Sequence, residues 1–304
     1  MRRQAYRRIH ALTAFGIAVT LVGCTAVPSG RFAAFADGTR SLATNSVTTY
    51  DGVVDLERTY MLYSPTTSRD GKLDEQSFKP VIVDEDGRKR DFDFKPRLEF
   101  RSAALDVLAD YADALHAFAT KDYQSDLDEA TQSLGASVAR VASEASGQDA
   151  TKAAGILATA INGMGRVATE YLRRKTLRQA MDTAQPGVDK LAALIATDNA
   201  SIVGAVHIMR RGIVRHANKL RPSTGLSRVS FDAAIAALLQ ESDDTLAELD
   251  AMNATVTAVP AAHADIRRSL DEKMDALASL QQLIAEAKRL NKFHKSTNKA
   301  DKGS

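Results

Sequence analysis

The most reactive side chain in this 304-residue sequence is that of Cys24, its only cysteine. It closes the run Leu21-Val22-Gly23-Cys24, which follows a short apolar stretch and, before that, four arginines. A thiolate is nucleophilic and can accept a covalent group. A single cysteine cannot form a disulfide within the chain, so the fold must be held by packing alone. The position therefore predicts modification of the sulfur.

Residues 1–23 have the order of a secretory signal. Residues 1–10 carry four arginines and no acid, and residues 11–23 are almost wholly apolar or small. A finished helix needs about 20 apolar residues to span a bilayer. We therefore expect this segment to be cleaved rather than to remain as an anchor.

The whole pattern resembles the signal peptide and lipobox of a bacterial lipoprotein precursor. The resemblance implies a diacylglyceryl group on the Cys24 sulfur, cleavage between Gly23 and Cys24, and acylation of the freed amine in Gram-negative species. In familiar Gram-negative sorting, an aspartate after the cysteine favours retention in the inner membrane. Thr25 stands there, which implies the outer membrane, facing the periplasm. The resemblance covers residues 1–24 and names no family for the rest.

The charge balance argues against a general nucleic-acid-binding protein. The full chain has 40 basic and 38 acidic residues. Removal of residues 1–23 takes away four arginines and no acid, which leaves 36 against 38 and a formal charge of −2. A protein of this balance does not attract polyanions over its whole surface. After residue 24, no stretch of 18 residues is apolar without a polar interruption, so no membrane-spanning helix is expected.

No motif predicts catalysis. The sequence lacks the zinc-protease, phosphate-binding-loop and nucleophile-elbow patterns, and the one thiol is expected to carry lipid. Asp113 and His116 are spaced like half of a di-iron site, but the second copy and the glutamates are missing. His207 and His216 are nine residues apart, and the acidic run 84–87 lacks calcium-loop spacing. We expect no enzyme, catalytic residue, cofactor or metal.

The elements that carry these residues are mostly helices. Apolar residues at three- and four-residue steps predict an all-α fold, an elongated antiparallel bundle. The predicted helices cover residues 31–64, 97–120, 123–146, 149–183 and 187–220, then one around Phe231–Met252 and one entered through Pro260 and ending near Leu290. A turn is predicted at Gln185-Pro186-Gly187, although Pro186 could equally begin the next helix. Residues 65–97 are an irregular or β-hairpin insert.

These elements give four segments: a signal peptide (1–23), a lipidated tether (24–30), a helical bundle (31–292) and a disordered basic tail (293–304). Within the bundle, three features are compatible with function. Gly155, Gly163 and Gly165 form a small-residue face suited to close helix packing or, alternatively, membrane insertion. Two basic clusters, 173–178 and 211–219, are predicted near helix C-termini, where positive charge is stabilising. The alternative is that they contact anionic lipid headgroups, cell-wall polymers or an acidic partner. Asp198 and His216 lie near an apolar face and need partners or an edge position.

The sequence therefore predicts a non-enzymatic lipoprotein of the cell envelope. It would be anchored to the membrane through Cys24 and would bind or scaffold an envelope protein or polymer. Two alternatives stay open: a membrane-active, pore-forming helical protein, suggested by the glycine-rich stretch 153–165, and an envelope hydrolase whose site is assembled from distant residues.

Overall fold

The computed structural model describes residues 27–63, 81–83, 89–91, 95–120, 123–143, 148–165, 169–221, 226–272 and 277–300. Seven helices account for nearly all of these residues, which confirms the all-α class. The helices are α2 (Ser29–Tyr63), α3 (Lys95–Ala119), α4 (Tyr123–Ser143), α5 (Gln148–Asn162), α6 (Glu170–Leu220), α7 (Leu226–Ser269) and α8 (Ala278–Ala300).

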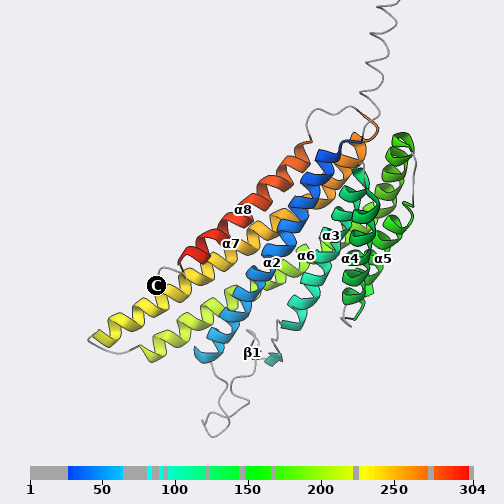
Figure 1. The fold of residues 1–304 in the computed structure, drawn as a ribbon. Helices are drawn as coiled ribbons and strands as arrows, with labels where there is room; N and C mark the ends of the chain where they lie inside the picture. Colours follow the sequence, from blue (N-terminus) through cyan, green and yellow to red (C-terminus); the bar gives the residue numbers. More distant parts are fainter. Residues whose placement is uncertain are drawn as a thin grey trace, which may run out of the picture.

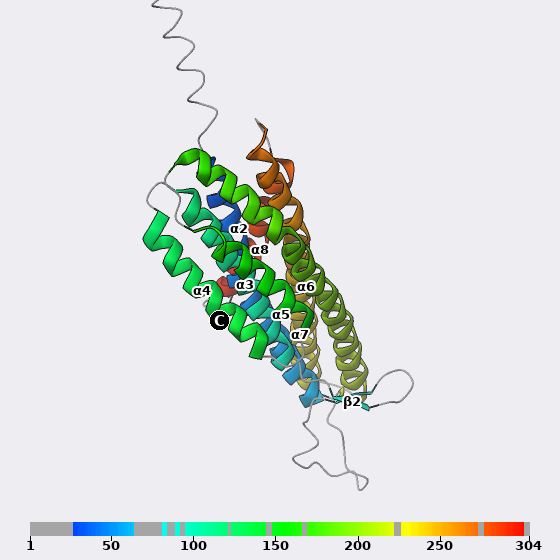
Figure 2. The ribbon, with the colours of Figure 1, turned by 90° about the vertical axis from the view of Figure 1, so that its right-hand side faces the viewer.

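The helices lie lengthwise beside one another in an elongated body (Figures 1 and 2). α2 contacts α3, α6, α7 and α8, and α6 contacts α2, α3, α5 and α7. α4 contacts α3 and α5 and lies at one side of the body, as Figure 2 shows. The end of α6 and the start of α7 project together at the lower left of Figure 1.

Contacts between residues show how neighbouring helices run. Arg178, near the start of α6, meets Asp271, just after the end of α7. Arg221, just after the end of α6, meets Asp232, near the start of α7. These two helices therefore run in opposite directions. α2 and α6 run in the same direction. Val27, just before α2, bonds to Glu170, the first residue of α6, and Tyr50 in the middle of α2 bonds to Asn199 in the middle of α6.

The core is a continuous set of aliphatic and aromatic side chains from all seven helices. Full burial of one such side chain contributes about 1.5–3 kcal/mol, so the three- and four-residue spacing that the sequence shows is what drives these helices together. Its largest fully buried members are Tyr111, Phe32, Phe35, Phe118, Leu42, Leu56, Leu105 and Leu108.

The insert at 65–97 is described only in part. Strand β1 (Val81–Val83) pairs antiparallel with β2 (Lys89–Asp91), with Val81 opposite Asp91. Residues 64–80, 84–88 and 92–94 lie outside the described residues. The acidic run 84–87 is among them.

The predicted tether of residues 24–30 is too long. Val27 is buried, and its N–H donates a hydrogen bond to Glu170 Oε1 at 2.7 Å. Helix α2 begins at Ser29. The burial of Val27 and its hydrogen bond to Glu170 hold this segment at the end of the body. Residues 27–30 therefore belong to the bundle.

The prediction of a single helix over 149–183 and a turn at 185–187 was wrong. The chain breaks between α5 and α6, where Gly165 has a φ of 51°, a backbone conformation that favours glycine. Thr169 then caps α6, its side-chain oxygen accepting from the Leu172 N–H at 3.3 Å. Pro186 lies inside α6 and does not end it.

The second predicted proline boundary was also wrong. Pro260 lies inside α7, and this helix ends at Ser269 instead. α8 continues to Ala300, beyond residue 292, where a disordered tail was predicted to begin. Leu290 is buried and Phe293 packs against the core. These contacts stabilise the helix beyond the point at which its polar composition predicts an end.

Close approach of α5 to α6 depends on Gly187. A Cβ at this position would lie 2.8 Å from the Ala153 carbonyl oxygen and 3.1 Å from a Leu157 methyl group. At Gly204, on the same helix, a Cβ would meet nothing within 4 Å.

We expect Gly187→Ala to lower the free energy of unfolding by about 1–3 kcal/mol, because α5 must move away from α6. The matched control Gly204→Ala should raise it by about 0.5–1 kcal/mol through helix propensity. Urea unfolding followed by circular dichroism measures both. Equal stability of the two variants would contradict the close contact.

Candidate functional site

The predicted site residues lie at the start of the chain. Gly23 and Cys24 are outside the described residues, which begin at Val27. The structure does describe the surroundings of Val27. Beside its partner Glu170, Tyr171 and Leu172 expose 70% and 42% of their surface. The end of the body at which the described residues begin thus carries exposed apolar surface.

Asp113 and His116 lie in an open groove of about 260 Å³ between α3 and α4. Arg40 of α2 crosses to Asp113, with 2.5 Å between Nη2 and Oδ1. Burial raises the pKa of Asp113, against the lowering effect of Arg40. The groove is lined by Arg40, Asp110, Asp113, His116, Ala117, Thr120, Asp126, Glu129, Ala130 and Ser133.

This groove is rich in carboxylates, and one of them, Asp113, is paired with Arg40. Across the ranges that the structure describes, no group of three or more His, Cys, Asp or Glu side chains is placed to hold a metal ion. His207 and His216 of α6 also lie outside any such group. The excess of acids over arginine in its lining suits a cationic group.

The first basic cluster has structural partners. Arg173 Nη1 donates to the Thr120 carbonyl at 2.7 Å, and Arg174 Nε donates to the Leu270 carbonyl. These carbonyls lie just after the ends of α3 and α7, where helices leave acceptors unsatisfied. The prediction that this cluster ends a helix was wrong. It lies in the first turns of α6 and caps two neighbouring helices.

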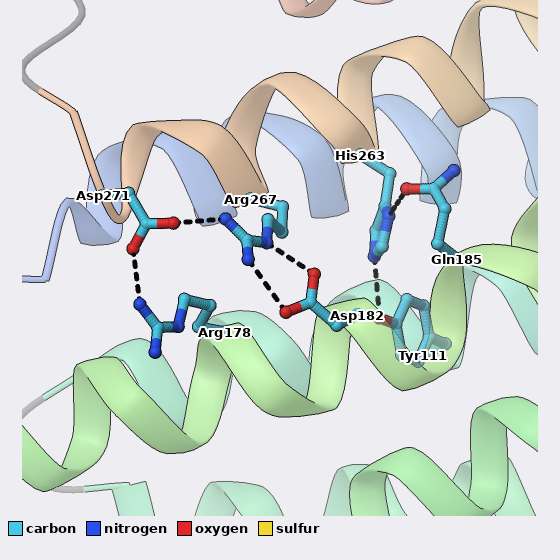
Figure 3. A network of polar contacts seen from close by, with 7 residues as sticks. All are labelled: Tyr111, Arg178, Asp182, Gln185, His263, Arg267 and Asp271. Atoms are coloured by element: carbon cyan, nitrogen blue, oxygen red, sulfur yellow. Dashed lines mark hydrogen bonds and ion pairs between the residues drawn. The ribbon is translucent and has the colours of Figure 1, made fainter.

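A chain of charged groups continues from this cluster (Figure 3). Arg178 Nη1 lies 2.9 Å from Asp271 Oδ1, and Asp271 also accepts from Arg267. Arg267 in turn binds Asp182 through two nitrogens, at 2.5 and 2.9 Å. Hydrogen bonding from Arg178 is the largest effect that lowers the pKa of Asp271. The chain joins α6 to α7.

Next to it, three buried or half-buried side chains form a polar triad across α3, α6 and α7 (Figure 3). His263 Nε2 is 2.8 Å from Tyr111 Oη, and His263 Nδ1 is 2.7 Å from Gln185 Oε1. An amide oxygen only accepts, so Nδ1 carries the proton and Nε2 accepts from the tyrosine hydroxyl. Gln185 Nε2 passes the chain on to Asp189 Oδ1 at 2.6 Å.

The triad holds its histidine neutral. His263 and Tyr111 have no exposed surface, and burial lowers the pKa of His263 from its ordinary 6.5 to about 3. Desolvation likewise raises the pKa of Tyr111 well above 10.0. The triad joins three helices through side chains of which two are completely buried.

No motif in the sequence predicts this triad, although the position of His263 is a signal for it. His263 stands four residues after Val259 and three before Ile266, on the apolar face of α7. A histidine at such a position needs a polar partner on another helix, and the sequence does not show which one.

The requirement that Asp198 lie at an edge or find a partner is confirmed. Its side chain is 41% exposed, and its Oδ2 accepts from Arg101 Nε at 3.2 Å. The side chain of Arg101 is only 6% exposed. The half-buried His216 also lies at an edge of the core. Arg101 interrupts the apolar face of α3, and its buried charge is paired with a carboxylate of α6.

The glycine-rich segment lies partly in the core. Ala153, Ala154, Leu157, Ala160 and Ile161 are buried in α5, which packs on α6. Added Cβ atoms at Gly155 and Gly165 would meet nothing within 4 Å, so these two glycines are not what brings the helices close. Among the described helices, α6 is long and apolar enough to cross a membrane by length and composition, with 39% of its apolar window buried.

The neutral histidine makes stability depend on pH. The unfolded chain takes up a proton at His263 below about pH 6.5, whereas the folded chain does not until about pH 3. The free energy of unfolding should therefore fall as the pH is lowered through this window, by up to about 1.4 kcal/mol per pH unit.

His263→Gln should remove the larger part of this slope between pH 6.5 and 5, above the range where most carboxylates titrate. A smaller slope should remain from His216, whose pKa is also lowered. The matched control His207→Gln changes an exposed histidine of α6 and should keep the wild-type slope. Urea unfolding at a series of pH values measures the difference. Identical slopes in the two variants would show that His263 is not held neutral.

No protein-family model matches the chain, and neither a curated protein nor a solved structure matches it. The function is therefore inferred from the chain's own residues and their arrangement.

Proposed function

We propose that this chain is a non-enzymatic bacterial lipoprotein, held in the cell envelope by lipid on Cys24. Its place is the outer membrane, facing the periplasm, and its helical body is a binding or scaffolding module for an envelope protein or polymer. The observation that carries the proposal is the position of Val27. It is buried at one end of the body, three residues after Cys24.

Three extended residues span at most about 10 Å. A lipid on Cys24 would thus hold the end of the body formed by Val27 and Glu170 against the membrane. The exposed Tyr171 suits that place, because a tyrosine ring is stable between apolar and wet surroundings. Two or more acyl chains anchor a protein stably, whereas one gives only marginal binding.

The arrangement of helices that fits this function is an elongated antiparallel bundle with a small β-hairpin insert. Its support is the opposite direction of consecutive helices. Asp265 near the end of α7 accepts from the Ser279 N–H at the start of α8, and Asp250, earlier in α7, meets Arg289, later in α8. Such a body extends away from its anchored end.

A pore-forming function is the second candidate, favoured by the length and apolar composition of α6. Against it stands the burial of α6 side chains among four other helices. Release of dye from liposomes by the full chain carrying Cys24→Ser would support it, and intact liposomes over a broad range of protein concentration would remove it.

We expect globomycin, which blocks the lipoprotein signal peptidase, to leave a larger precursor in a lipoprotein-competent host. Mass spectrometry of the mature protein should find a first residue, Cys24, that carries a diacylglyceryl group. The control Cys24→Ser should give no lipidated product. Unchanged migration with the inhibitor, or an unmodified thiol in the isolated protein, would contradict the anchor.

A further inference from the structure

The projecting end of the α6–α7 pair exposes large aliphatic side chains. Leu220, Leu226 and Val229 are 62%, 86% and 65% exposed. Leu226 is the most exposed large apolar residue in the part of the chain that the structure describes. Leaving such side chains in water costs the free energy that burial would otherwise provide. A cluster of them at the end of a helix pair indicates a contact surface.

Cations lead along α6 to this aliphatic cluster. Arg211, Arg215 and Lys219 are exposed and follow one another at four-residue steps along α6. Among the described residues, no carboxylate pairs with any of the three, whereas Arg210 of the same turns pairs with a carboxylate of α7. We call Leu220, Leu226, Val229, Arg211, Arg215 and Lys219 the hairpin-end patch.

Further charges make the same end positive. Arg221 and Arg228 share a single carboxylate, that of Asp232. The pKa of His216 is lowered, first by burial and next by the nearby positive charges of Lys219 and Arg215. The end of the helix pair therefore has a net positive field.

Helix dipoles alone do not explain this composition. Cations near the C-terminus of α6 are stabilised by about 0.3–1 kcal/mol. The same effect disfavours Arg228, which lies in the first turn of α7, and the first turn of α7 has no acid. The dipole also gives no reason for aliphatic side chains to project into water beside these cations.

We propose that the hairpin-end patch docks on an anionic lipid bilayer. Aliphatic side chains at a convex end can enter the boundary between headgroups and acyl chains, while basic side chains reach the lipid phosphates. A protein partner would need a cavity shaped to this end, and interface centres are rich in aromatic anchors. The exposed apolar residues of the patch are all aliphatic, which favours the bilayer.

The patch has a graded geometry. A residue step of four along a helix is about 6 Å, so Lys219, Arg215 and Arg211 lie progressively farther from the end. The headgroup layer of one leaflet is roughly 5–8 Å thick. Lys219 should therefore contribute most to binding and Arg211 least.

The docking proposal does not depend on lipid at Cys24, because it uses residues of α6 and α7 only. α6 has 51 residues and is about 75 Å long. Its first residue contacts Val27 and its last belongs to the hairpin-end patch. If the anchor is also present, the protein would contact two lipid surfaces, one at each end.

The test places a fluorophore on the patch of the full-length chain. Cys24→Ser removes the natural thiol, and Val229→Cys introduces one for labelling with an environment-sensitive dye. The matched control is Val47→Cys, a 47% exposed position on α2. Vesicles contain phosphatidylcholine, with or without phosphatidylglycerol. Emission from the Val229 label should shift to the blue with anionic vesicles, and emission from the Val47 label should not change.

Lys219→Gln should weaken this binding about fivefold, the value of one basic side chain at an anionic surface. Arg215→Gln and then Arg211→Gln should have smaller effects. Lys190→Gln, on the middle of α6, should have none. A water-like emission at Val229 with anionic vesicles would overturn the proposal, and so would equal shifts at Val229 and Val47. If the protein binds vesicles only through its N-terminal segment, the Val229 label will keep its water-like emission.

Discussion

Packing around α6 is the constraint on which the rest of the structure depends. This helix contacts four others, and eighteen of its residues are buried. Two of its glycines allow the closest approaches. Gly187 faces the backbone of α5, and a Cβ at Gly212 would lie 2.3 Å from the ring of Tyr60. Because α6 lies this close to α5 and α2, small residues rather than large ones determine where neighbouring helices can be placed.

The same packing explains why two prolines failed to end helices. A proline inside a helix costs about 3 kcal/mol or more, whereas each fully buried large aliphatic side chain contributes about 1.5–3 kcal/mol. Within one or two turns of Pro186, α6 buries Met181, Val188 and Leu191 completely. α7 does the same around Pro260 with Val256 and Val259. Continued burial outweighs the local penalty, and a reading of turn residues alone does not include it.

The sequence alone predicts the bounds of a helix where one apolar face continues without interruption. The periodicity that begins near Leu98 predicted α3 closely, and α2 and α4 also lie near their predicted bounds. The sequence does not predict a helix end where that end depends on contacts with other helices. The arginines after Thr169 look like a C-terminal cluster until the carbonyls that they cap, from α3 and α7, are known. The partners of His263 also come from two other helices, so no local pattern identifies them.

Burial of polar groups inside the body and exposure of apolar groups at its ends have a common consequence. Tyr111, His263 and Gln185 satisfy one another across three helices, so the middle of the body has no exposed reactive group there. Apolar side chains are instead exposed at Tyr171, beside the start of the described chain, and at Leu226, near the far end of α6. A continuous helix of about 75 Å separates these two positions, and its neighbours hold it lengthwise. The ends cannot approach each other without loss of the core. Two surfaces held at this separation are what a spacer or scaffold requires.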